Sequence, residues 1–412
     1  MNIYLIIIPS ILIFDYIVAT IVRILNIKAL DSPLPNEFKG MVDKENFVKS
    51  HNYTRVNSNF DFITSTFSLL VSLFFIFSGF YNIIDKFVIA LGFNYIITGI
   101  LFFIILIIIT DILTIPFNLY KTFIIEEKFG FNKTNLSTFI IDKLKGYLIL
   151  SLLGLPLLWT VLYFFNKFPS YAWFYTWILV SLFGIIIQPI FNLFIAPLFN
   201  KFTPLSNGLL LDKIQDYLKK VNFPVKKLEV MDGSKRSSHS NAYFSGFGNN
   251  KRIALFDTLL DQMDEEEIVA IIAHEVGHYK LKHIHYSIIL NSIQSGIMLF
   301  ILSLFIMNDN LFAVFKMENL SIYASLLFFS ILYTPISMIM NVFFNFVSRQ
   351  NEYSADKYSA ITYNKPEKLI SALKKMSRDN LSNLTPHWLN IFMNYTHPPV
   401  INRIKALKLH VK

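Results

Sequence analysis

Residues 95–118 read YIITGILFFIILIIITDILTIPFN, an apolar run in which Asp111 is the one charged residue. A helix needs about 20 apolar residues to cross the roughly 30 Å hydrocarbon core of a bilayer, so this run predicts a membrane-spanning helix. Other runs share this character, and together they predict seven spans: 3–26, 62–83, 95–118, 146–166, 172–199, 286–307 and 323–347. The sequence therefore predicts an all-α integral membrane protein.

The composition agrees with a membrane protein. Of the 412 residues, 54% are hydrophobic and 16% are charged, whereas soluble domains contain about 25% charged residues. So high an apolar content excludes an intrinsically disordered chain. The sequence contains no cysteine, which excludes a disulfide framework, a thiol nucleophile, a Cys-ligated metal and an iron–sulfur cluster.

Basic residues are unevenly distributed between the two sides of the predicted membrane. The chain has 37 Lys and Arg against 28 Asp and Glu, a net charge of +9. Three short connections contain Lys86, Lys167 and Lys316, and most other basic residues lie in the opposite set of segments: 27–61, 119–145, 200–285 and the tail from 348. Because basic residues accumulate on the cytoplasmic side, the N-terminus is predicted to lie outside or in the lumen. The basic excess is thus explained without nucleic acid, and we expect contact with membrane lipid instead.

The chain is expected to have two domains. The first, 1–200, is an N-terminal membrane domain with five spans, and the second, 201–412, contains the last two spans. Between the fifth and sixth spans, residues 207–221 show helical periodicity, while 226–231 and 251–256 have the pattern of short strands. This polar segment predicts a small cytoplasmic α+β lobe.

Residues 264–285 are predicted to form a helix within this lobe. Asp264 and Glu267 have the spacing of a capping box, so the helix should begin near Asp264. It contains the sequence HEVGH at 274–278. Gly277 in a helix interior costs about 1 kcal/mol relative to Ala, and close packing of another element against the helix would account for it.

The HEVGH pattern indicates a metal centre. Helical spacing places His274 and His278 on one face about one turn apart, where both imidazoles can ligate one tetrahedral metal ion. Glu275 lies beside the first ligand and is placed to hold a metal-bound water. Since the chain has nine histidines, the pattern is rare by chance, which favours a metal centre over ordinary helix residues.

Catalytic zinc usually takes three protein ligands, so a third must be found. Glu352, in SRQNEYSAD at 348–356, follows the last span on the membrane face where the metal helix is predicted. Asp356, one turn further, could accept the free N–H of a ligating histidine. On spacing alone, a solvated charged helix is the alternative for both carboxylates. His283 and His285 are predicted to be interfacial or solvated rather than metal ligands.

Several segments together carry a family resemblance. Besides HEVGH and SRQNEYSAD, they are EEKFGFNK at 126–133, PLFN at 197–200, SNAYFSGF at 240–247, and HPP at 397–399 with Arg403. On these residues the chain resembles the type I CAAX prenyl proteases, the sterile-24-type integral-membrane zinc metalloproteases among the gluzincins. The resemblance covers nearly the whole length.

The resemblance implies roles for particular residues. It implies one Zn²⁺ per chain, bound by His274, His278 and Glu352, with Glu275 as the general base. It places the substrate alongside an edge strand containing Asn241, Ala242 and Tyr243, and it places His397 and Arg403 at the cleaved carbonyl. Without the resemblance, Asn241 is most simply a turn residue and His397 begins a loop.

In this family the seven helices surround a large chamber below the metal site, so the resemblance implies one here. The residues themselves show that Asp15 and Asp111 lie inside apolar runs. Ionisable groups in such positions face a cavity or a partner more often than lipid. We therefore expect both carboxylates to point away from lipid.

The leading hypothesis is a membrane zinc endopeptidase that removes the C-terminal tripeptide from prenylated proteins. The alternatives are a broad-specificity endopeptidase for membrane-protein quality control and a non-catalytic zinc-binding chaperone, although Glu275 argues against the latter. A transporter would predict paired repeats with broken helices, which the sequence does not show. The expected partners are a peptide or prenylated C-terminus and membrane lipid, and the expected oligomeric state is a monomer. The expected location is the endoplasmic reticulum membrane in a eukaryote and the inner membrane in a bacterium.

Overall fold

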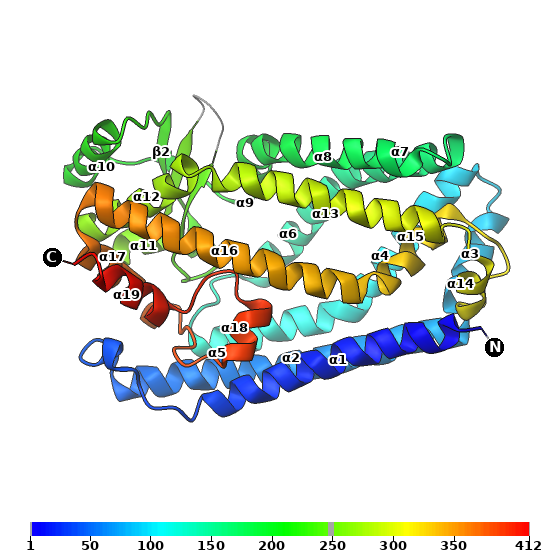
Figure 1. Cartoon of the computed structure of the whole chain (residues 1–412), viewed down its shortest axis with the longest axis horizontal. Helices are drawn as coiled ribbons and strands as arrows, with labels where there is room; N and C mark the ends of the chain where they lie inside the picture. The colour runs from blue at the N-terminus through cyan, green and yellow to red at the C-terminus, as the bar shows by residue number, and fades with distance from the viewer. Residues whose placement is uncertain (1, 246–250, 412) are drawn as a thin grey trace.

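The computed structural model describes residues 2–245 and 251–411, and these are mostly helical. Long helices run along the molecule, and a small sheet with short helices lies at one end (Figure 1). The N-terminus and the C-terminus lie at opposite ends of this long axis (Figure 1). The arrangement confirms a helical membrane protein with a small α+β lobe.

Among the described residues, six long helical stretches are apolar enough to cross a membrane: Tyr4–Ala29 (α1), Lys44–Ser78 (α2), Tyr95–Phe129 (α4 to α5), Leu136–Lys167 (α6 to α7), Ala172–Phe199 (α8 to α9) and His283–Phe305 (α13). The seventh predicted span is a pair of helices, Ile322–Leu332 (α15) and Thr334–Tyr363 (α16), bent by 58°. Pro335 lies in the first turn of α16, where its ring prevents a continuous helix through the break. Counting the bent pair as one span gives the predicted seven.

The second span has different bounds from the predicted 62–83. Helix α2 begins at Lys44, where the Asp43 carboxylate accepts a hydrogen bond from the Asn46 N–H at 2.7 Å. It ends at Ser78 because Gly79 adopts a left-handed conformation with φ of 74°. The residues that follow form a separate helix, Phe80–Ala90 (α3), so the predicted end at residue 83 is wrong.

Three of the spanning stretches contain a π-helical turn. They divide into these segments: α4 (Tyr95–Tyr120), η2 (Lys121–Glu126), α5 (Glu127–Phe129), α6 (Leu136–Ile149), η3 (Leu150–Gly154), α7 (Leu155–Lys167), α8 (Ala172–Ile190), η4 (Phe191–Ile195) and α9 (Ala196–Phe199). Two of these turns come just before a proline, η3 before Pro156 and η4 before Pro197. A proline lacks the N–H donor and crowds the carbonyl four residues earlier, so the helix widens there.

The lobe is built on a four-stranded sheet in the order β1-β2-β4-β3. Its strands are Phe202–Pro204 (β1), Lys227–Met231 (β2), Ala242–Ser245 (β3) and Arg252–Phe256 (β4). Strands β2 and β4 are parallel, the other pairs are antiparallel, and β3 is an edge strand. The strands predicted at 226–231 and 251–256 and the helix predicted at 207–221 are confirmed, the last as Leu209–Lys220 (α10).

Short helices complete the described chain: η1 (Asn36–Phe38), η5 (Gly233–Lys235), α11 (Asp257–Gln262), α12 (Glu265–Lys280), α14 (Asp309–Val314), α17 (Pro366–Asp379), α18 (Trp388–Asn394) and α19 (Val400–Lys408). The lobe has its own apolar core, in which Ile253 and Leu255 of the sheet pack with Ile272 of α12. A second core joins the spans around Phe102 and Tyr323. The metal helix is therefore held on a rigid, buried support.

Both intramembrane carboxylates point to polar surroundings, as predicted. Asp15 lines a cavity of about 490 Å³ between α1, α2, α16 and α18, together with Arg23 and Asp61. Asp111 accepts a hydrogen bond from the Lys143 ammonium at 2.6 Å. Each charge thus has a polar neighbour within the membrane region.

Candidate active site

Helix α12 begins at the predicted capping box. The Asp264 carboxylate accepts from the Glu267 N–H at 2.8 Å, and the Glu267 carboxylate accepts from the Asp264 N–H at 2.9 Å. The helix ends at Lys280, because Lys282 adopts a left-handed conformation with φ of 61°. The predicted continuation to residue 285 is therefore wrong, and His283 begins the next helix, α13.

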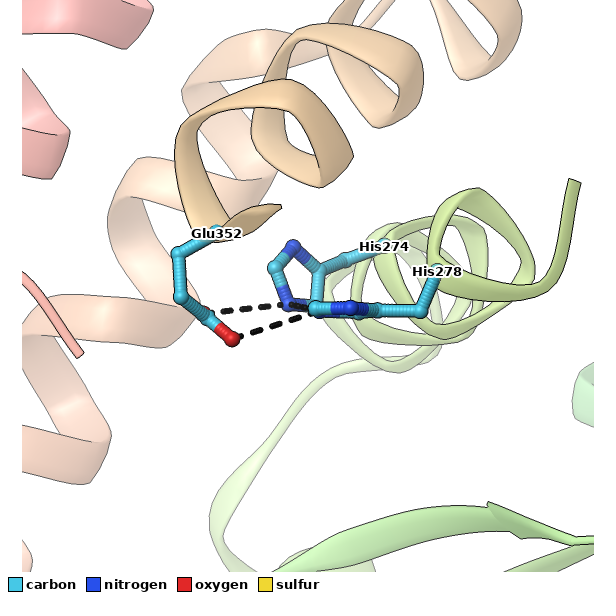
Figure 2. Close-up of side chains that lie close together, drawn as sticks. All are labelled: His274, His278 and Glu352. Atoms are coloured by element: carbon cyan, nitrogen blue, oxygen red, sulfur yellow. Dashed lines mark hydrogen bonds and ion pairs between the residues drawn. The ribbon is translucent and has the colours of Figure 1, made fainter. Parts of the chain in front are cut away.

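Three side chains predicted as metal ligands meet at one point. The Nε2 atoms of His274 and His278 lie 3.0 Å apart. The Glu352 carboxylate is 3.5 Å from His274 Nε2 and 3.3 Å from His278 Nε2. Figure 2 shows both imidazoles on α12 facing the carboxylate on α16. One atom from each residue falls within 4.8 Å of the others, a spacing at which they could hold one metal ion.

Gly277 lets α16 approach α12 closely enough to bring these ligands together. A Cβ atom at this position would lie 3.2 Å from the Ala355 Cα and 3.1 Å from the Tyr358 Cβ, both on α16. Contacts this short leave little room for a side chain. The close packing predicted from this glycine is confirmed, and its partner is the helix that carries Glu352.

Asp356 lies behind His274, as its spacing suggested. The Asp356 carboxylate is 2.9 Å from His274 Nδ1, and it accepts from Arg403 Nε at 2.8 Å and from Nη2 at 2.6 Å. Burial by itself lowers the pKa of His274, but Asp356 and Glu352 outweigh it and raise that pKa to about 9. Surroundings that stabilise positive charge on this ring also suit a cation beside it.

His283 contacts the Nδ1 atom of His278, as Asp356 contacts that of His274. Its Nδ1 is 3.0 Å from the Nδ1 of His278, and its Nε2 is 3.1 Å from the Ser354 hydroxyl. The Ser354 hydroxyl in turn donates to the Asn351 carbonyl at 2.9 Å. His283 is only 7% exposed, so the prediction that it is interfacial or solvated is wrong.

The donor set fits a metal ion. The Nδ1 atoms of His274 and His278 face Asp356 and His283, and the two Nε2 atoms face one another across 3.0 Å. The Glu352 Oε2 atom is buried, and among the described residues no donor meets hydrogen-bond geometry with it. Two ring nitrogens and a carboxylate that converge on one point are a donor set to which a cation such as zinc would bind.

A cavity of about 380 Å³ opens beside these ligands. Most of the predicted site residues line it: Asn241, Ala242, His274, Glu275, His278, Glu352, His397 and Arg403. Asp356 lies behind this wall, and Tyr243 lines a neighbouring cavity instead. The structure therefore gathers the predicted catalytic and metal-ligating side chains around one space.

The remaining predicted residues differ in exposure and in contacts. Burial raises the pKa of Glu275, although the two histidines beside it oppose this. His397 is 64% exposed, and its Nε2 lies 3.3 Å from Glu352 Oε1. Arg403 is 10% exposed, and its Nη1 lies 3.1 Å from Glu352 Oε2 while its other nitrogens bond Asp356. Arg403 thus ties two carboxylates together, and its predicted contact with the cleaved carbonyl stays a prediction.

The segment predicted to bind substrate begins at the edge of the sheet. Asn241 directly precedes β3, and its carbonyl accepts from the Phe256 N–H at 3.1 Å. Its side-chain oxygen accepts from the Ala242 N–H at 2.8 Å. Because β3 is the last strand of the sheet, an extended peptide can pair beside it, next to the histidine cluster.

An HExxH helix that meets a carboxylate from a second helix, within a bundle of membrane spans, defines an integral-membrane metallopeptidase. Comparison with known proteins places the chain within this class. It matches two family models, described as the CAAX prenyl protease N-terminal region with five membrane helices at residues 23–201 and peptidase family M48 at residues 204–411. The chain belongs to peptidase family M48.

Relatives resemble the chain over most of its length. The CAAX prenyl protease 1 homolog of Arabidopsis thaliana is 35% identical, over 95% of this chain and 94% of its own. The human protein of that name is 33% identical, over 91% of this chain and 88% of its own. The crystal structure of S. mikatae Ste24p superposes with a TM-score of 0.93 and 30% identity, covering 98% of this chain and 99% of that one. The family resemblance predicted from the sequence is confirmed.

Proposed function

We propose that this chain is a zinc endopeptidase that removes the C-terminal tripeptide from prenylated proteins. The observation that carries the proposal is the meeting of His274, His278 and Glu352 beside a cavity that also contains Glu275 and the edge strand. Relatives named as CAAX prenyl proteases match over nearly the whole chain, which supports this substrate.

We assign the metal as one zinc ion per chain. Two imidazoles and one carboxylate are the ligand set of many catalytic zinc sites, which leave a fourth position open. When bound, zinc polarises the peptide carbonyl and lowers the pKa of a water molecule toward about 7. Asp356 and His283 orient the two imidazoles, so that a zinc ion would be held through Nε2 of each.

Glu275 acts as the general base. It lines the cavity one residue from His274, where it accepts a proton from the attacking water and returns that proton to the leaving amine. The raised pKa of its carboxyl favours holding the proton until it is returned to the leaving amine. His397, exposed at the mouth of the cavity, donates to the carbonyl oxygen as negative charge develops. Arg403 contributes positive charge at the same place and holds Asp356.

The substrate backbone pairs with β3 as an added strand. Asn241, Ala242 and Tyr243 supply the backbone edge, and the bonds are made by main-chain groups of the peptide. Main-chain pairing does not depend on the substrate's sequence, and this favours a second candidate function. A broad-specificity endopeptidase for membrane proteins would use the same edge without any need for prenylation.

We further propose how the molecule is placed in the cell. The membrane domain comprises 1–200 and the metallopeptidase domain 201–412, with the active site facing the cytoplasm and the N-terminus on the other side, as the distribution of basic residues suggests. The membrane is that of the endoplasmic reticulum if the source is eukaryotic and the inner membrane if it is bacterial. We propose that the protein works as a monomer in contact with lipid.

Product analysis distinguishes the two candidate functions. Purified protein is incubated with a farnesylated C-a-a-X peptide, and the masses of the products are measured by mass spectrometry. The proposal expects a free tripeptide and a peptide ending in farnesyl-cysteine. Cuts at several internal bonds would favour the broad-specificity endopeptidase and contradict the proposed reaction.

A further inference from the structure

A second cavity, of about 720 Å³, lies beside the catalytic one. Its walls come from the end of the fifth span, from the sheet and from the start of α13. Apolar side chains dominate these walls, among them Ile187, Phe191, Phe199, Met231, Tyr243 and Phe256. Its volume falls within the roughly 300–1,000 Å³ of typical small-molecule sites.

One face of the sheet forms a wall of this cavity. Met231 pairs with Phe256, and Tyr243 pairs with Ala254, so these side chains share a face. The opposite face carries Leu255 and packs into the core of the lobe. Since successive residues of a strand point to opposite faces, Tyr243 projects toward the cavity while its neighbour Ala242 is buried in that core.

The facing wall contains the π-helical turn η4. Phe191 and Asn192 of this turn line the cavity. The Asn192 carbonyl accepts a hydrogen bond from Arg252 Nη1 of β4 at 3.0 Å, and the Arg252 guanidinium lies 3.7 Å over the Phe202 ring. The widened turn is thus fixed to the sheet. Single π-helical turns within α-helices occur frequently at functional sites.

The cavity adjoins the catalytic cavity on one side. Phe244 and Ile284 line both spaces. Ile284 directly follows His283, which contacts the metal-ligand residue His278. A molecule in the apolar cavity therefore lies next to a peptide paired with β3.

The η4 turn that lines this cavity also carries exposed apolar side chains. Leu193 and Phe194 of η4 are 65% and 66% exposed, as expected for side chains in contact with acyl chains. An apolar chain dissolved in the bilayer can therefore reach the cavity along η4 without crossing water.

We propose that this cavity binds the isoprenoid chain of the substrate while its peptide pairs with β3. A substrate residue opposite Tyr243 points to the same face of the sheet, and that face opens into the cavity. A lipidated cysteine at that register places its isoprenoid against Phe191, Met231 and Phe256. The inference rests on the proposed function, since it requires a prenylated substrate.

The first test fills the cavity. Ala196 is 6% exposed and lines the wall, so Ala196→Phe adds a ring to this space. We expect the ratio of kcat/KM for a farnesylated peptide to that for its unprenylated twin to fall at least about tenfold. Gly184→Phe adds the same ring on the same span, where no atom lies within 4 Å of the new Cβ, and it should keep the wild-type ratio. An unchanged ratio in Ala196→Phe would overturn the inference.

The second test uses the wild-type protein and does not depend on the folding of a variant. A substrate peptide carrying a diazirine-labelled isoprenoid is bound, irradiated and mapped by mass spectrometry. Label on Phe191, Phe199 or Tyr243 supports the inference, and label elsewhere or none on these residues overturns it. Failure of the proposed function gives a different result, because wild-type protein would then cleave neither peptide or both equally.

Discussion

His283 and His278 face each other through their Nδ1 atoms at 3.0 Å, although a left-handed residue, Lys282, separates the two helices that carry them. The Nε2 of His283 is in turn 3.1 Å from the Ser354 hydroxyl on α16. One ring therefore links the metal helix, the sixth span and the helix of Glu352. A ligating imidazole is usually held by an acceptor on its second nitrogen, and in the proposed zinc site that acceptor for His278 is another imidazole.

Replacing His283 should weaken zinc binding. His283→Leu removes the acceptor for the His278 Nδ1–H, and we expect a roughly 10–100-fold loss of zinc affinity, measured by competition with a chromogenic chelator. His283→Asn places an amide oxygen near the lost Nδ1 and should restore most of the affinity. His285→Leu is the matched control, because this side chain is exposed on the same helix. Equal losses in Leu and Asn variants would contradict the orienting role.

Glu352 should be required for metal binding. Glu352→Gln keeps the shape of the side chain but removes the charge that faces both imidazoles and Arg403. We expect the purified variant to contain far less than one zinc per chain by elemental analysis, with cleavage reduced in parallel. Full zinc occupancy together with full cleavage would show that another group is the third ligand.

Glu275 should be required for turnover but not for metal binding. Glu275→Gln preserves size and polarity while removing the base, so zinc content should stay near one per chain. The turnover number should fall by roughly 10²–10⁴-fold, the usual contribution of a general base. Surviving turnover would assign the proton transfer to a different residue.

The first turn of the metal helix should make stability depend on pH. Hydrogen bonds from Lys365 and Tyr363 and the ammonium of Lys213 lower the pKa of Glu266 from about 4.5 to about 2. Because the folded pKa lies below the unfolded one, this stabilisation is present above about pH 4.5 and disappears as the pH falls toward 2.

Thermal unfolding in detergent tests the direction of this pH dependence of stability. Glu266→Gln should lower the apparent Tm by about 1–3 °C at pH 7, and the difference from wild type should shrink below pH 4.5. Glu265→Gln is the control, since this neighbouring carboxylate is 44% exposed and lies 3.9 Å from Lys213 Nζ. A difference that grows on acidification would contradict the prediction.

Much of the fold could be predicted because it depends on long apolar runs and on helix signals. The capping box at Asp264 and the spacing of His274 and His278 are local features, and both were predicted correctly. The end of α2 was predicted wrongly, because Gly79 stops the helix inside an apolar run where hydropathy does not change. The bend before α16 was missed in the same way, although Pro335 could have indicated it.

The site was predictable where residues close in sequence act together and less so elsewhere. The sequence predicts His283 to be interfacial or solvated on a helix that continues to residue 285, and a lysine gives no signal for the left-handed turn that ends this helix. Tyr243 was grouped with Asn241, yet strand alternation turns its side chain into the neighbouring cavity. That distinction requires the register of the sheet, which depends on residues distant in sequence.

The most direct measurement compares a farnesylated C-a-a-X peptide with its unprenylated twin. Both are incubated with purified, detergent-solubilised protein, with and without a zinc chelator, and release of the tripeptide is followed. We predict efficient cleavage of the farnesylated peptide, abolished by the chelator and restored by added zinc, with much slower cleavage of the twin. Equal cleavage of both peptides, or cleavage that survives complete zinc removal, would contradict a zinc-dependent prenyl-protein protease.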